Sequence, residues 1–190
     1  PQNPKTPKPQ NPASISNNTY PMEKSGDNEE EFNKTFIQEP AILDKYKAAA
    51  DVADRALAYV VTLCVPEADI AEVCSKGDSF IEEEIKKVYS NKKSKKLERG
   101  VAFPTCINVN SICLHYSPLK DESSILKEGD VAKLDLGCHL DGYFAHVGTT
   151  LVVSADPEKK YEGPIANLLV AGQTALEAAI RTTIAGNTNE

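Results

Sequence analysis

The apolar positions of the first patterned segment follow helical spacing. From residue 41 to residue 64, apolar side chains recur every three or four positions, at Ile42, Tyr46, Ala49, Ala53, Leu57, Val60 and Leu63. Side chains at that spacing share one face of an α-helix. Pro66 blocks continuation of the helix, because proline lacks the N–H donor that a helix interior needs. The pattern predicts an amphipathic helix over residues 41–64.

Two further segments show the same periodicity. Residues 70–88 carry apolar side chains at helical spacing, and Gly77 interrupts them. Because glycine within a helix costs about 1 kcal/mol relative to alanine, we expect a kink or a break there. Residues 165–184 predict a third helix, with apolar positions at Leu168, Leu169, Ala171, Ala175, Leu176, Ala179 and Ile180.

Strand patterns occupy the middle of the chain. Residues 100–105 and 107–116 predict two strands, and Pro104 predicts an edge position or a turn, since proline cannot donate to a sheet ladder. Residues 119–129 and 154–163 are polar and rich in turn formers. Helices grouped in this way with antiparallel strands predict an α+β fold.

The segment Val131 to Val153 predicts a β-hairpin. β-Branched and alternating residues flank Asp141-Gly142, and a two-residue Asp-Gly loop is the strongest short hairpin signal. A type I′ turn at this loop would pair Leu140 with Tyr143 and residue 137 with residue 146. Asp135 and His146 would then lie on the same sheet face as diagonal neighbours, about 7–8 Å apart at their backbones. Both side chains could reach toward one metal ion.

Three stretches resemble the proliferation-associated, ErbB-receptor-binding protein family. They are CSKGDSFIEEE (74–84), GVAFPTCINVNSICLHYSPL (100–119) and LKEGDVAKLDLGCHLDGYFAHVGTT (126–150). The resemblance runs from residue 42 to residue 190, with the stretches in the family's order. That family comprises non-catalytic relatives of the type 2 methionine aminopeptidases, in the peptidase M24 superfamily with its "pita-bread" fold. The resemblance implies the N-terminal half of a pita-bread fold, an antiparallel sheet with helices on one face.

The resemblance also assigns candidate metal positions. In the aminopeptidases, two aspartates eleven positions apart on this hairpin bind a pair of divalent metals. Asp135 matches the first aspartate, and His146 stands where the second would be. His115 matches a histidine that contacts substrate in the aminopeptidases. His139 alternates onto the same face as Asp135, but by itself it predicts no ligand.

The substitution at position 146 argues against peptidase chemistry. A dinuclear hydrolase needs ligands that hold two cations about 3.5–4 Å apart, whereas a neutral imidazole binds one metal through one nitrogen. We therefore expect no enzyme activity and no cofactor, with Asp135, His146 and His115 as vestigial positions. On that reading, Asp135 is a hairpin acid satisfied by backbone N–H groups, and His146 is a surface or cleft histidine. The alternative is a methionine aminopeptidase that holds two ions such as Co, Mn or Zn despite His146.

Length and composition narrow the class of protein. The chain has 190 residues, 41% of them hydrophobic, which leaves room for one domain plus tails. No apolar run approaches the roughly 20 residues that cross a bilayer, so we expect no membrane partner. The cysteines are odd in number and form no CxxC pair, which favours reduced thiols over a zinc cluster: Cys64, Cys74, Cys106, Cys113 and Cys138.

The two ends of the chain differ from its centre. Residues 1–36 are polar and lack hydrophobic periodicity, so we expect a disordered tail. We expect residues 1–21 to be translated leader or cloning sequence, because the only methionine is Met22. Residues 37–190 are predicted to form the N-terminal part of the aminopeptidase-like domain, and the resemblance implies that its C-terminal half is missing.

A basic cluster interrupts an otherwise acidic chain of net charge −7. Its members are Lys86, Lys87, Lys92, Lys93, Lys95, Lys96 and Arg99. Basic clusters bind phosphate backbones by releasing counterions, although the same residues also suit a helix C-terminus or a nuclear localisation signal. The resembled family is linked with ribosomes, ribosomal RNA and pre-ribosomal particles, so the resemblance implies that this cluster contacts RNA.

These observations predict a non-catalytic scaffold rather than an enzyme. Its expected partners are the ribosome, ribosomal or other structured RNA, and proteins, in ribosome biogenesis, translation and growth regulation. The expected locations are the cytoplasm, nucleus and nucleolus, and for the full-length chain a monomer is favoured over an oligomer. A metal-dependent methionine aminopeptidase and a DNA-binding protein of the same fold remain the alternatives.

Overall fold

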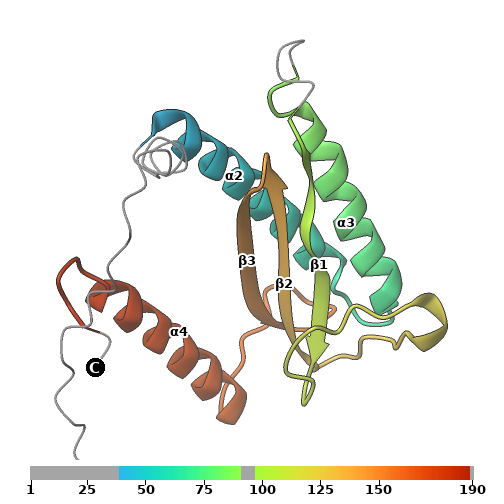
Figure 1. The fold of residues 1–190 in the computed structure, drawn as a ribbon. Helices are drawn as coiled ribbons and strands as arrows, with labels where there is room; N and C mark the ends of the chain where they lie inside the picture. The colour runs from blue at the N-terminus through green and yellow to red at the C-terminus, as the bar shows by residue number, and fades with distance from the viewer. Residues whose placement is uncertain (1–38, 91–96, 189–190) are drawn as a thin grey trace, which may run out of the picture. The chain divides into compact units, whose positions relative to one another are not determined.

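The computed structural model describes residues 39–90 and 97–188 (Figure 1). The predicted tail over residues 1–36 lies outside this range, as do Lys92, Lys93, Lys95 and Lys96. Helix α2 (Pro40–Leu63) confirms the first predicted helix. Pro40 suits its first position, where the missing N–H costs no hydrogen bond.

Helix α3 (Ile70–Lys87) runs through Gly77 without a break, so the break that the sequence suggested is wrong. A β-carbon at Gly77 would lie 2.6 Å from Thr105 Oγ1 and 2.8 Å from Val60 Cγ2. Both distances are shorter than atoms tolerate without moving. Glycine is therefore used here to let α3 approach α2 and the sheet closely.

The described strands form one antiparallel sheet in the order β1 (Arg99–Val109), β2 (Val131–Leu140), β3 (Tyr143–Val152). Strand β1 is an edge of this sheet, as Pro104 predicted, and its register shifts on both sides of Phe103. The second predicted strand, 107–116, is wrong beyond Val109. The chain turns at Asn110, which has a φ of 51° and accepts a hydrogen bond from Val131 N. It then returns so that Ile107 N donates to Tyr116 O over 2.9 Å.

The hairpin between β2 and β3 has the predicted turn and register. Asp141 and Gly142 have φ values of 57° and 80°, both in the left-handed region that a type I′ turn requires. Leu140 pairs with Tyr143, and Gly137 pairs with His146. The turn is tied to α2, because Lys45 Nζ lies 2.5 Å from the Asp141 carboxylate.

The two faces of the sheet differ in burial. Alternate residues of β2 are buried on the side of α2 and α3: Ala132, Leu134, Leu136, Cys138 and Leu140. The opposite face carries Asp135 and His146. Helix α4 (Pro164–Thr182) confirms the third predicted helix, yet none of its residues is buried. Among the described helices, none combines the length and the apolar character that a membrane span needs.

Candidate functional site

Asp135 and His146 meet on the open face of the sheet. Strand β2 presents Asp135 and β3 presents His146, and the register places them as diagonal neighbours. His146 Nε2 lies 3.8 Å from Asp135 Oδ1. The side chain of His146 is 44% exposed and that of Asp135 is 20% exposed. The hairpin therefore forms the carboxylate and imidazole pair that its sequence predicted.

Asn108 holds the carboxylate from the neighbouring strand. Its Nδ2 donates to Asp135 Oδ2 and to Lys133 O, each over 3.1 Å, and its Oδ1 accepts from Tyr116 N over 2.8 Å. A side-chain amide thus satisfies one oxygen of Asp135, where the sequence suggested backbone N–H groups. Asp135 Oδ1 is buried and has no hydrogen-bond partner among the described residues. Asn108 itself is fully buried; the signal for it was a polar residue between the apolar Ile107 and Val109.

Two imidazole rings lie beside the aromatic ring of Phe103. The centre of its ring lies 4.6 Å from that of His146 and 5.7 Å from that of His115. His115 is exposed and has a left-handed backbone, with a φ of 63°. His139 belongs to the hairpin turn instead, since Gly142 N donates to its Nδ1 over 3.4 Å. The structure therefore groups His115 and His146 around Phe103 and leaves His139 apart.

The described donors do not fit a dinuclear metal centre. Asp135 offers one unpartnered oxygen, and His146 offers one nitrogen. An imidazole cannot bridge two ions or offset their charge as a carboxylate does. In the described part of the chain, no three histidine, cysteine, aspartate or glutamate side chains come together as a metal site.

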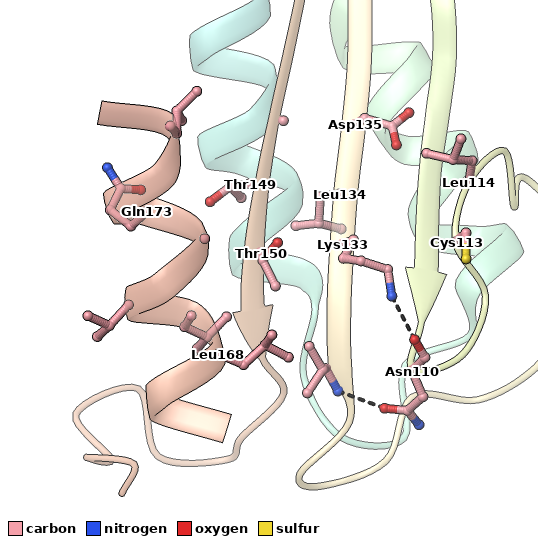
Figure 2. A pocket seen from close by; sticks show the side chains of 16 residues that line it. Asn110, Cys113, Leu114, Lys133, Leu134, Asp135, Thr149, Thr150, Leu168 and Gln173 are labelled. Atoms are coloured by element: carbon pink, nitrogen blue, oxygen red, sulfur yellow. Dashed lines mark hydrogen bonds between the residues drawn. The ribbon is translucent and has the colours of Figure 1, made fainter. Parts of the chain in front are cut away.

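An open cavity of about 990 Å³ lies beside this carboxylate (Figure 2). Asp135, Lys133 and Thr150 line it from the sheet, and Leu114 and Cys113 line it from the segment after β1. Helix α4 supplies the facing wall, including Leu168, Leu176 and Gln173. Lys133 Nζ donates to Asn110 O over 2.8 Å. The cavity can take a ligand with an apolar body.

Four of the cysteines are buried, and their thiols are unreactive. Burial raises the thiol pKa to about 12 at Cys64, Cys74 and Cys106, and to about 11 at Cys138. At Cys106 the adjacent Asp135 carboxylate raises the pKa further. Thiols with such pKa values are protonated at neutral pH and are poor nucleophiles. Cys113 is exposed.

The described part of the basic cluster lies at the end of α3. Lys86 pairs with Glu82 at 3.3 Å, and Lys87 pairs with Glu84. Arg99 donates from Nη1 to Val88 O over 2.5 Å and from Nε to Leu97 O over 3.2 Å. Lys86 and Arg99, with Tyr89 and Ser90, line a second open pocket of about 220 Å³. Lys87 does not line that pocket.

Comparison with known proteins places this geometry in a family. The sequence model of metallopeptidase family M24 matches residues 44–189. "ERBB-3 BINDING PROTEIN 1" of Arabidopsis thaliana is 43% identical over 165 residues, covering 87% of this chain and 41% of the relative. "Proliferation-associated protein A" of Dictyostelium discoideum is 41% identical over 153 residues, covering 80% of this chain and 39% of the relative.

A further relative and a solved structure both carry the name Arx1. "Probable metalloprotease arx1" of Schizosaccharomyces pombe is 33% identical over 156 residues, covering 77% of this chain and 37% of the relative. The structure of a thermophilic Arx1 superposes with a TM-score of 0.71 at 32% identity, covering 80% of this chain and 42% of that one. The chain therefore spans about two fifths of the length of the relatives it matches, and its elements form the corresponding part of a pita-bread fold.

Proposed function

Because this chain belongs to metallopeptidase family M24, we propose that it acts as a non-catalytic scaffold built on a peptidase fold. Its proposed partners are ribosomal or other structured RNA and proteins. Its proposed role is in ribosome biogenesis, translation and growth regulation, in the cytoplasm, nucleus and nucleolus.

One observation carries the non-catalytic part of the proposal. His146 stands on the open sheet face with its Nε2 3.8 Å from Asp135 Oδ1, where peptidase chemistry needs a second carboxylate. Two cations held about 3.5–4 Å apart require ligands that bridge them and offset their charge. A neutral imidazole does neither, and when protonated it repels cations.

The names of similar proteins support a binding role. They include an ErbB-3 binding protein and a proliferation-associated protein, at 43% and 41% identity. The name of arx1, "Probable metalloprotease", favours the alternative, a metal-dependent aminopeptidase. The sequence resemblance to a ribosome-linked family supports RNA as a partner, and the basic residues at the end of α3 offer a place for it.

Metal content and peptidase activity of the full-length protein decide between scaffold and enzyme. We expect no stoichiometric divalent ion and no release of N-terminal methionine from peptides, after dialysis against Co, Mn or Zn. His146→Asp restores the second carboxylate and should raise divalent-ion affinity. His139→Asp adds the same charge at the hairpin turn and serves as the matched control. Two tightly bound metals with turnover that Asp135→Ala abolishes would contradict the proposal.

Ribosome binding is tested separately. We expect the full-length protein to sediment with ribosomal subunits and to crosslink to ribosomal RNA. Competition with duplex DNA of matched length distinguishes RNA binding from DNA binding. Failure to bind ribosomes or RNA, with tight binding of duplex DNA, would favour the DNA-binding alternative.

A further inference from the structure

Tyr89 adopts a backbone conformation that its side chain disfavours. Helix α3 ends at Lys87, Val88 is its C-cap, and Tyr89 follows with a φ of 47°. Glycine or asparagine is usual at this position, because a β-carbon in the left-handed region crowds the backbone. The Tyr89 side chain is not part of the core, and the residue is 38% exposed. Packing in the described core therefore does not account for a tyrosine at this position.

Tyr89 lines a small pocket together with polar and cationic side chains. The pocket of about 220 Å³ is lined by Lys86, Tyr89, Ser90 and Arg99. It thus gathers two cationic side chains, two hydroxyl groups and one aromatic ring. All four residues belong to the described part of the chain.

Arg99 is already fixed in place at this pocket. Its guanidinium donates to Val88 O and to Leu97 O, over 2.5 and 3.2 Å. The Val88 carbonyl lies at the end of α3, where the helix dipole is negative and would repel an anion. The bound guanidinium offsets that field at the pocket. Little side-chain freedom remains to be lost when a ligand binds.

Lys86 can turn toward a ligand with little loss of free energy, because it gives up only an exposed ion pair. Its Nζ lies 3.3 Å from Glu82 in an i,i+4 pair, and both side chains are more than half exposed. Exposed pairs of this kind are weak, so an anion of higher charge density can replace Glu82 as the partner of Lys86.

We infer that this pocket holds a backbone phosphate of single-stranded RNA, with the adjacent base stacked on Tyr89. The inference rests on the proposed function and names the site and form of RNA that it would take. Lysine and arginine form charge-assisted hydrogen bonds to phosphate oxygens, and hydroxyl groups add neutral donors. An aromatic ring stacks on any unpaired base. An acidic peptide would use the cations but would leave the ring unused.

Two substitutions and a matched control test the site in the full chain. The probes are a 12-nucleotide RNA of mixed sequence without self-complementarity and the duplex that it forms with its complement. Tyr89→Leu should weaken single-strand binding by roughly 5- to 150-fold, the effect of one stacked base, and should leave duplex binding unchanged. Lys86→Gln should weaken both and lower the single-strand salt slope by about 0.7. Lys76→Gln should change neither, although Lys76 also pairs with a glutamate four residues before it on α3, Glu72, at 2.6 Å.

Tyr89→Gly separates a functional ring from a structural one. Glycine relieves the left-handed strain, so this variant should melt at or above the temperature of the unmodified protein while it binds single-stranded RNA as weakly as Tyr89→Leu. Tyr89→Phe should keep its affinity. A Tyr89→Gly variant that loses stability and keeps its RNA affinity would overturn the inference.

The remaining outcomes distinguish this inference from the proposed function. If the unmodified chain binds RNA and the Tyr89 and Lys86 variants match Lys76→Gln, the pocket is not the site, although the proposed RNA binding stands. If polyglutamate binds and is lost in Lys86→Gln, while Tyr89→Leu has no effect on either ligand, the site takes an acidic protein. If no form binds RNA or ribosomal subunits, both proposals fail.

Discussion

At the scale of the residue, single side chains decide what the open sheet face can do. His146 places an imidazole nitrogen 3.8 Å from Asp135 Oδ1. Asn108 donates to the other oxygen of Asp135 and so holds the carboxylate in place. A carboxylate that is held by a buried amide is a stable part of the fold.

Gly77→Ala should destabilise the protein. Alanine normally gains about 1 kcal/mol over glycine inside a helix, but its β-carbon would lie 2.6 Å from Thr105 Oγ1. Overpacking of this kind costs typically 1–3 kcal/mol, so we expect a lower free energy of unfolding in urea. Gly172→Ala in α4 is the control, because nothing lies within 4 Å of its β-carbon position; it should be neutral or stabilising. Equal gains for both variants would show that α3 does not pack as closely as described.

Thiol labelling should separate Cys113 from the other cysteines. The four buried thiols have pKa values raised by burial to about 11 or 12, whereas Cys113 is exposed. Iodoacetamide at pH 8 should modify Cys113 alone in the folded protein and all five cysteines in urea. Mass spectrometry of the labelled peptides checks this, with Cys113→Ser as the control. Rapid native labelling of Cys106 would contradict the burial of the site.

At the scale of the element, the start of α3 depends on one carboxylate. Asp69 is the N-cap, and its Oδ1 accepts from Glu72 N and from Ser123 Oγ, each over 2.9 Å. The hydrogen bond from Glu72 N–H, followed by that from Ser123, lowers the pKa of Asp69 below its ordinary value of 3.8. This cap also joins α3 to the segment before β2, since Ile70 N donates to Ser124 O over 3.0 Å.

The stabilisation by Asp69 should depend on pH in a defined direction. Because its pKa is lower in the folded state, its contribution is complete above about pH 4 and is lost as the pH falls through the lowered value. Asp69→Asn keeps an acceptor but does not titrate. Thermal melting is measured from pH 7 to pH 2. The unmodified protein should melt at a higher temperature than Asp69→Asn at pH 7, and this difference should vanish toward pH 2. A difference that grows on acidification would contradict the assignment.

The strands show how a local pattern can mislead about an element's end. Residues 107–116 have the composition of a strand, yet β1 ends at Val109. Asn110 adopts a left-handed turn, and its Nδ2 donates to Asp130 Oδ1 over 2.9 Å. The partner residues come from the start of β2, about twenty positions later in the sequence. A reading of neighbouring residues therefore could not place this turn.

At the scale of the whole molecule, α4 presents an uncovered apolar surface. Leu168, Val170 and Ile180 are each more than 60% exposed. Exposed apolar surface on one helix favours association, so the 190-residue chain should bind hydrophobic dyes and self-associate at high concentration.

Polar substitution on α4 should reduce that association without cost to the fold. The double variant Leu168→Gln and Ile180→Gln removes exposed apolar area and disturbs no buried contact, so its melting temperature should not fall. Leu136→Gln is the control, because Leu136 is fully buried in the sheet and its loss should unfold the protein. Light scattering and thermal melting measure the two effects. If the unmodified chain is strictly monomeric and unfolds in one sharp thermal transition, the exposed apolar surface of α4 does not need a partner.

Local sequence pattern was enough to predict the described helices and the pairing of the hairpin. Helical spacing gave α2, α3 and α4, and Asp141-Gly142 set the register that puts Asp135 and His146 on one face. These features depend on a period of about 3.6 or 2 residues and on a turn of two residues, which neighbouring residues specify.

The surroundings of those positions depend on contacts between segments that are far apart in the sequence. Asn108 reaches Asp135 from 27 positions away in the sequence. The packing of Gly77 against Thr105 joins α3 to β1, and the register shifts around Phe103 bring its ring to His115 and His146. Contacts of this kind depend on how distant segments pack, and the periodicity of any one segment carries no information about its neighbours in space.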